Sequence, residues 1–114
     1  MKGKITHSAD QDEYPHPTHN NFYLRDVVTA ADNPDLSVHR GRIEVGGEIF
    51  PHTHEGQTET FYILSGEALC TLGDTTTSVT AGACTVAPVG VAHGLKNTGD
   101  SPVELLALFT PPLK

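Results

Sequence analysis

The sequence predicts a single all-β domain, either a sandwich or a barrel. Roughly eight to ten short segments along the chain are rich in β-branched or aromatic residues or alternate between two kinds of side chain with a period of two. Glycine, proline and asparagine clusters separate these segments, and no stretch carries a convincing helical period. A chain of 114 residues with 37% hydrophobic residues fits one domain with a real core.

The first 21 residues are polar and irregular, so we divide the chain into an N-terminal arm (1–21) and a barrel domain (22–114). Pro15 and Pro17 forbid a helix in the arm and remove two backbone donors. His7, His16 and His19 invite a second metal site, but their spacing fixes no shared face. We expect a solvated arm, with a lid over a pocket as the alternative.

The expected strands follow one another with short turns between them. Gly46-Gly47 is expected to turn the chain, and Ala87–Gly90 to form a type I turn with proline second and glycine fourth. The predicted strands are residues 22–28, 36–45, 50–54, 58–64, 67–72, 75–80, 83–87, 93–97 and 103–110.

Two of these segments carry further information about their surroundings. In 36–45, period-two alternation places Arg40 and Arg42 on one face, which is either plain surface or faces an anionic ligand. Segment 58–64 is largely apolar on both sides, which predicts burial on both faces. A buried carboxylate is costly unless it is paired, so Glu59 needs a partner such as a metal.

A candidate metal site stands out around that glutamate. His52 and His54 are two residues apart, and on a strand such residues point to the same side. Glu59 follows five residues later, and His93 lies downstream. Imidazole nitrogens and a carboxylate oxygen are standard ligands of divalent transition metals.

These residues also carry a resemblance to the cupin superfamily. The first cupin motif is matched at every spacing by Gly46, His52, His54, Glu59 and Gly66. The second is matched by Gly82, Pro88, Gly90, His93 and Asn97. The resemblance implies a double-stranded β-helix, a jelly-roll barrel in which His52, His54, Glu59 and His93 are metal ligands and Asn97 is structural. Ala83 departs from the aspartate found there in many cupins.

The cofactor is therefore expected to be one divalent transition metal, with iron, manganese, nickel, copper and zinc all open. We expect a metal-dependent enzyme on a small organic substrate. Dioxygenase-like oxidoreductase chemistry is preferred over decarboxylase, isomerase and lyase alternatives. The competing hypotheses are a non-catalytic cupin that binds or senses a small ligand, and a structural metal in an oligomeric assembly.

Residues that share strand faces with the ligands are candidates for the substrate pocket. The predicted pocket walls are Phe50, Phe61, Ile63 and Leu95. Candidate acids or bases near the metal are Glu48, Tyr62 and Arg42. The sequence offers no recognisable Ser/His/Asp arrangement and no glycine-rich phosphate loop.

Composition limits the partners. The formal charge of −7 without a basic patch disfavours nucleic acid and membrane surfaces. With no secretory or membrane-spanning pattern, the cytoplasm is the expected location. Cys70 and Cys84 are expected to be buried, reduced thiols, and sequence cannot say whether they are close. The resemblance implies a homodimer.

Overall fold

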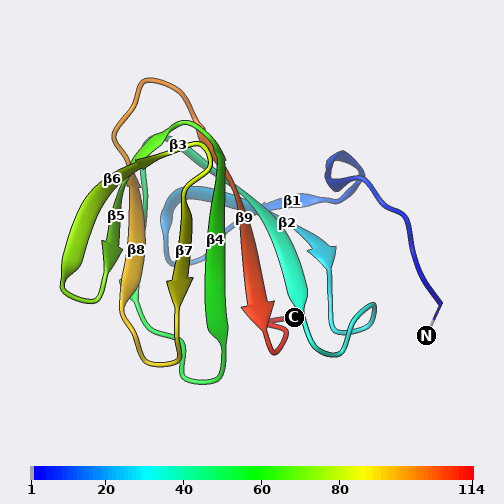
Figure 1. Cartoon of the computed structure of the whole chain (residues 1–114). Helices are drawn as coiled ribbons and strands as arrows, with labels where there is room; N and C mark the ends of the chain where they lie inside the picture. Colours follow the sequence, from blue (N-terminus) through cyan, green and yellow to red (C-terminus); the bar gives the residue numbers. More distant parts are fainter. Residues whose placement is uncertain (1) are drawn as a thin grey trace.

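The computed structural model describes residues 2–114 and consists of a curled antiparallel sheet of nine strands (Figure 1). The all-β prediction is confirmed, since the described residues contain only one short 3₁₀ turn, Ser8–Asp10. The strands are β1 Glu13–Pro15, β2 Asn20–Val28, β3 Ser37–His52, β4 Thr58–Ser65, β5 Glu67–Leu72, β6 Thr75–Thr80, β7 Cys84–Ala87, β8 His93–Asn97 and β9 Val103–Thr110.

The long strand β3 is shared by both halves of the sheet. Along one edge it pairs with β2. Along the other edge, residues 37–43 pair with β9, and the segment that includes Glu48, Ile49 and His52 pairs with β8. The strand order is β6-β5-β8-β3-β9-β4-β7, and this change of partner lets the sheet curl into a half-barrel.

The predicted turn at Gly46-Gly47 is therefore wrong, because the chain bends there without leaving the strand. Gly46 has φ of +78°, a conformation that side chains with a Cβ rarely adopt. A Cβ on Gly47 would lie 2.9 Å from the carbonyl oxygens of Asn20 and Glu44. The two glycines thus provide the backbone freedom and the space that the bend requires.

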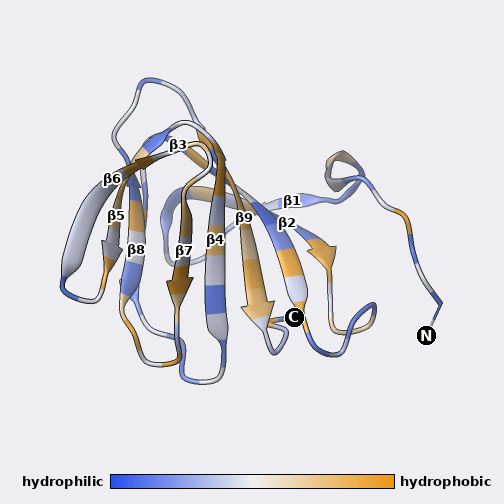
Figure 2. Cartoon of the chain, in the orientation of Figure 1, coloured by the Kyte–Doolittle hydropathy of each residue, from blue (hydrophilic) through white to orange (hydrophobic). Residues whose placement is uncertain are grey.

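The core lies on the concave side of the sheet, where alternate residues of each strand point inward. Ile43, Ile49, Val103 and Leu105 are each at most 2% exposed. In Figure 2, β9 is largely apolar, whereas β6 is mostly pale because it consists almost entirely of threonine and serine. Strand β4 is buried on one face only, since Tyr62 on its outer face is 42% exposed. The prediction of burial on both faces is wrong.

The N-terminal segment also differs from the expected solvated arm. Strand β1 pairs with β2, with Tyr14 opposite Leu24, and β2 begins at Asn20. His16 continues this contact, as its backbone N–H donates to the Phe22 carbonyl at 2.8 Å. Pro15 is tolerated because β1 is an edge strand.

Two smaller expectations need correction as well. The tight turn begins at Pro88, whose carbonyl accepts from the Val91 N–H at 3.0 Å, so glycine takes the third position. Gly90 has φ of +78° there, which suits a type II turn. Cys70 is buried, but Cys84 is exposed, and both are free thiols.

Within residues 2–114, no helix has the length and apolar character needed to cross a membrane.

Candidate metal centre

Four side chains from three strands and one loop converge at one end of the half-barrel. His52 ends β3, His54 follows in the loop, Glu59 lies on β4, and His93 begins β8. His52 and His93 sit directly opposite each other in the β3–β8 register. One donor atom from each of the four residues lies within 4.8 Å of the others. The structure therefore brings together all four residues that the sequence singled out.

Hydrogen bonds orient these side chains toward a common point. Glu59 Oε1 lies 2.8 Å from His93 Nε2 and 3.0 Å from His54 Nε2, and His52 Nε2 lies 3.2 Å from His54 Nε2. All three imidazoles thus present Nε2 to the same place.

The opposite ring nitrogens of two ligands are held by the backbone. His52 Nδ1–H donates to the Phe50 carbonyl at 2.7 Å, and His93 Nδ1–H donates to the Val91 carbonyl at 3.0 Å. An Nδ1–H bond of this kind fixes the tautomer and leaves the Nε2 lone pair free to coordinate a metal. The donor set of three imidazoles and one carboxylate fits a divalent transition ion.

Burial shapes the charges of this cluster. Glu59 is 4% exposed and His93 is 1% exposed. Burial alone would raise the pKa of Glu59, but hydrogen bonds from His54 and His93 outweigh it and lower that pKa. Burial lowers the pKa of His52, which favours the neutral imidazole that coordinates metals. Burial alone would lower the pKa of His93. The hydrogen bond to Glu59 outweighs this effect, so the pKa of His93 is raised.

A small cavity of ≈ 40 Å³ adjoins the cluster. Its walls include His52, His54 and Glu59 together with apolar side chains from β2, β3 and β9. These apolar walls are Phe22, Leu24, Ile49, Ala107 and Phe109. The cavity therefore brings ligand residues and an apolar surface to the same small space.

The walls predicted from sequence differ from these. Phe50 is 43% exposed, while Ile63 and Leu95 fill the core. Phe61 also lies in the core, with its ring centroid 5.8 Å from that of His93. They differ because β4 and β8 run away from the ligands into the barrel interior, whereas β2 and β9 border the mouth.

Comparison with known proteins settles the family. The family model described as "Cupin domain" matches residues 39–109, which include all four converging residues. The chain belongs to the cupin family.

Relatives and solved structures agree with this cupin assignment. A germin-like protein, subfamily 2 member 2, from Arabidopsis thaliana is 38% identical over 85 residues, covering 68% of this cupin and 39% of the relative. An oxalate-binding protein from Thermotoga maritima is 32% identical over 70 residues, covering 61% of this cupin and 58% of the relative. The matched part of the chain thus spans less than two thirds of the length of either relative.

The fold of a solved structure is also similar. A Thermotoga maritima protein described as a predicted oxalate decarboxylase superposes with a TM-score of 0.83 at 21% identity, covering 95% of this cupin and 99% of that chain. At this identity the likeness establishes the fold alone.

The N-terminal segment of the cupin covers the mouth of the cavity. His16 and His19 both line it, and the His19 ring centroid lies 4.7 Å from that of His52. The Phe50 N–H donates to His19 Nδ1 at 3.1 Å, which ties the segment to β3. Burial lowers the pKa of His19 to about 4. His7 is exposed. Of the two readings left open for this segment, the covering position is the one observed.

A buried hydrogen-bond chain that sequence reasoning missed lies at the other end of the cavity. His39 Nδ1 is 2.7 Å from Asp26 Oδ1, and its Nε2 is 2.9 Å from Ser37 Oγ. Ser37 is fully buried and accepts from the Leu113 N–H at 2.9 Å. The order of groups is that of a Ser/His/Asp arrangement, yet the serine is closed off. This hydrogen-bonded group holds the C-terminal segment in place through Leu113 and does not present a nucleophile.

The predicted acid–base candidates point away from the cavity. Tyr62 lies on the outer face of β4, and Arg42 forms ion pairs with Glu13 and Glu44 on the outer face of β3. Glu48 is opposite Lys96 in the β3–β8 register, and inward-pointing Ile49 follows it. His39 could have been suspected from its place on the inward face of segment 36–45. His16 and His19 carried no such signal.

Proposed function

We propose that His52, His54, Glu59 and His93 bind one divalent transition metal. The observation that carries this proposal is the convergence of four donor atoms within 4.8 Å, beside a cavity that His52, His54 and Glu59 line. Three neutral imidazoles and one carboxylate around a divalent ion leave a net charge of +1, which a partly apolar site tolerates better than +2. Iron, manganese, nickel, copper and zinc are all compatible with these ligands.

We further propose that this cupin is a metal-dependent enzyme acting on a small carboxylate-bearing molecule. An ion that prefers six ligands would keep two positions open for a substrate or dioxygen and would act as a Lewis acid there. The cavity of ≈ 40 Å³ holds only a few water-sized groups, which suits a very small substrate. A relative is named for binding oxalate, a small dicarboxylate, and this supports the substrate class. Decarboxylation and oxidative cleavage are the reaction types we place first.

In this proposal the side chains around the metal keep water out of the cavity and limit the size of the substrate that can enter. Phe22, Leu24 and Phe109 line the cavity together with the proposed ligands and exclude water from it. His19 sits over His52 and limits the size of what can reach the ligands.

A non-catalytic binding protein is the second candidate, and one observation favours it. The three acid–base candidates, Glu48, Tyr62 and Arg42, do not face the cavity. Beyond the proposed ligands, the titratable side chains that line the cavity are His16, His19 and His39; His39 is held by Asp26 and Ser37, and His19 accepts from the Phe50 N–H. A site whose remaining histidines are tied up in this way suits ligand capture as well as turnover.

Metal analysis of the purified protein, followed by turnover assays, tests both proposals. We expect one equivalent of a transition metal in the wild type and in His7→Ala, an exposed histidine outside the cluster. His52→Ala and Glu59→Gln should lose it. Carbon dioxide release or oxygen uptake with oxalate and related acids would support the enzyme, and tight ligand binding without turnover would support the binding protein. Full metal occupancy in both cluster variants would show that the site lies elsewhere.

We also propose that this cupin forms a homodimer in a reducing compartment, the cytoplasm. The outer face of β4 and β7 exposes Tyr62 (42%) and Val86 (51%), an apolar surface that a second copy would cover. The exposed free thiol of Cys84 suits a reducing environment. Light scattering after size-exclusion chromatography tests the dimer, and Tyr62→Glu with Val86→Glu should yield monomers if this face is the interface.

A further inference from the structure

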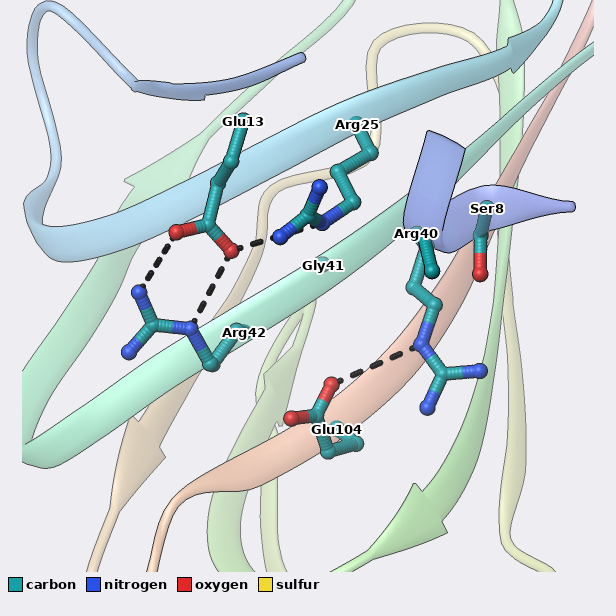
Figure 3. Close-up of a pocket in the computed structure, with 8 residues that line it drawn as sticks. Ser8, Glu13, Arg25, Arg40, Gly41, Arg42 and Glu104 are labelled. Carbon is teal, nitrogen blue, oxygen red and sulfur yellow. Dashed lines mark hydrogen bonds and ion pairs between the residues drawn. The ribbon is translucent and has the colours of Figure 1, made fainter. Parts of the chain in front are cut away.

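All three arginines of the chain line one pocket on the outer side of the sheet. Arg25 lies on β2, Arg40 and Arg42 lie on β3, and the pocket measures ≈ 380 Å³ (Figure 3). Ser8 and Ala9 of the 3₁₀ turn, together with Glu13 and Glu104, complete its lining. We call this space the arginine pocket. It opens on the face opposite the metal ligands, since inward-pointing His39 and Ile43 alternate with Arg40 and Arg42.

The arginine pocket gathers all the arginines of an acidic molecule. The three guanidinium groups and two carboxylates of its lining give a formal charge of +1, whereas the whole chain carries −7. Glu44, which lies outside the lining, pairs with Arg42 and offsets that charge on the Arg42 side of the pocket. The four lysines lie outside this lining. Arginine, unlike lysine, presents a planar fork that matches the oxygens of a carboxylate or phosphate.

Two of the arginines oppose each other directly. Arg25 and Arg40 are partners in the β2–β3 register. Like charges directly opposite on neighbouring strands destabilise a sheet unless something neutralises them. An anion between the two would do so.

The protein itself neutralises these two arginines poorly. Arg42 is well paired, with Glu13 at 2.7 Å and with Glu44. Arg25 Nε lies 3.7 Å from Glu13, and Arg40 Nε lies 3.6 Å from Glu104, both too long for a charge-assisted hydrogen bond. Arg25 donates one bond to the Gln11 carbonyl. Within residues 2–114, the Arg40 guanidinium makes no hydrogen bond of its own, so its terminal N–H groups are available to a ligand.

We propose that the arginine pocket binds a small oxyanion, a carboxylate or a phosphate group, between Arg25 and Arg40. Arg40 provides the bidentate contact, Arg25 provides the second positive charge, and the Ser8 hydroxyl, which lines the same pocket, is a further donor. The Glu104 carboxylate occupies part of this position in the free protein and competes with the ligand for Arg40. This proposal does not depend on the metal centre, which lies on the other face.

Binding of inorganic phosphate and of succinate is measured at matched ionic strength. Calorimetry gives the affinity, and the NMR chemical shifts of the Ser8 and Gly41 backbone amides report the place of binding. The experiment is run on the wild type and on His52→Ala, which lacks one of the four proposed metal ligands and is expected to lose the metal. Binding should be equal in these two proteins and should weaken as salt is raised. A tenfold preference for either anion identifies the source as a phosphate or a carboxylate compound.

Three variants move the affinity in different directions if the proposal is right. Arg40→Ala should weaken binding by about tenfold or more, the value of a lost charge-assisted bidentate contact. Glu104→Gln should tighten it severalfold, because the competing carboxylate is gone. Lys96→Ala, which removes an exposed cation on β8, should leave it unchanged. Equal losses in Arg40→Ala and Lys96→Ala, no gain in Glu104→Gln, or no binding by the wild type would overturn the proposal.

Discussion

Asn97 holds the turn after β8 against the middle of β3. Its Nδ2 lies 3.0 Å from the Ile43 carbonyl oxygen, 3.1 Å from that of Glu44 and 2.9 Å from that of Ser101. Its Oδ1 accepts from the Gly99 N–H at 2.9 Å. The expectation of a structural role for this motif residue is confirmed, since the amide serves backbone groups at the bend of β3.

Asn97→Ala should therefore destabilise the fold. The change leaves buried carbonyl groups without donors, which costs about 1–3 kcal/mol. For a domain of this size, Tm should fall by roughly 5–15 °C. Thermal and urea unfolding measure the effect, with exposed Lys96→Ala as the control. An unchanged Tm would mean that water replaces the side chain without loss.

Asp26 provides a prediction about pH. Burial opposes its charge, but hydrogen bonds from Tyr14 and His39 outweigh burial and lower the pKa of Asp26 below its ordinary value. A carboxyl with a lowered folded-state pKa adds stability above its unfolded pKa, about 3.9, and loses it as pH falls through the folded value. Asp26→Asn should be less stable than wild type at pH 7, and the gap should narrow below about pH 4. Urea unfolding at both pH values measures this, and a constant gap would contradict it.

Among single residues, those whose role depends on their spacing to residues nearby in the sequence were predicted best. Motif spacing identifies His52, His54, Glu59 and His93. The expected strand 50–54 was too long, because β3 ends at His52 and His54 lies in the loop that follows. His16 and His19 reach the cavity only because β1 pairs with β2, a long-range contact that no local pattern encodes. The same holds for the link between Ser37 and Leu113, which are 76 residues apart.

Strands β3 and β8 approach each other closely beside the ligands. A Cβ on Gly94 would lie 2.9 Å from the Ile49 carbonyl oxygen and 2.9 Å from the Pro51 nitrogen. These are backbone atoms, so the strands themselves would have to move apart. Because His93 precedes Gly94 and faces His52, that movement would separate two proposed ligands.

Gly94→Ala is thus expected to weaken both the fold and metal binding. Overpacking of this kind costs about 1–3 kcal/mol. Metal titration and urea unfolding should both show a loss. Gly56→Ala is the matched control, because a Cβ there meets nothing within 4 Å. Equal behaviour of the two variants would argue that the strands adjust without cost.

Strands were predicted well where glycine, proline or asparagine residues mark the turns between them. Segments 67–72, 75–80, 93–97 and 103–110 coincide with β5, β6, β8 and β9. The failure at Gly46-Gly47 has a physical cause. The same glycine pair serves a tight turn or a bend within one strand, and the pairing partners β8 and β9 decide between them.

For the whole molecule, the proposed metal should act as a clamp between sheet halves. It would join β3 and β8 to β4, and a ligand that binds only the folded state stabilises it. A free metal concentration one hundred times Kd should add about 2.7 kcal/mol to the free energy of unfolding. Thermal unfolding of metal-free and reloaded protein measures this. Glu59→Gln should gain less, and an equal gain would place the metal outside the cluster.

The continuity of β3 has a consequence for hydrogen exchange. One strand of 16 residues carries His52 at its end and the backbone of Arg40 and Arg42 further back, with a paired neighbour on each edge. Its amides around Gly41 can exchange with solvent only when neighbouring strands also open, so they should be among the slowest in the molecule. Metal bound at one end should slow them further, and an oxyanion in the arginine pocket should add to that protection.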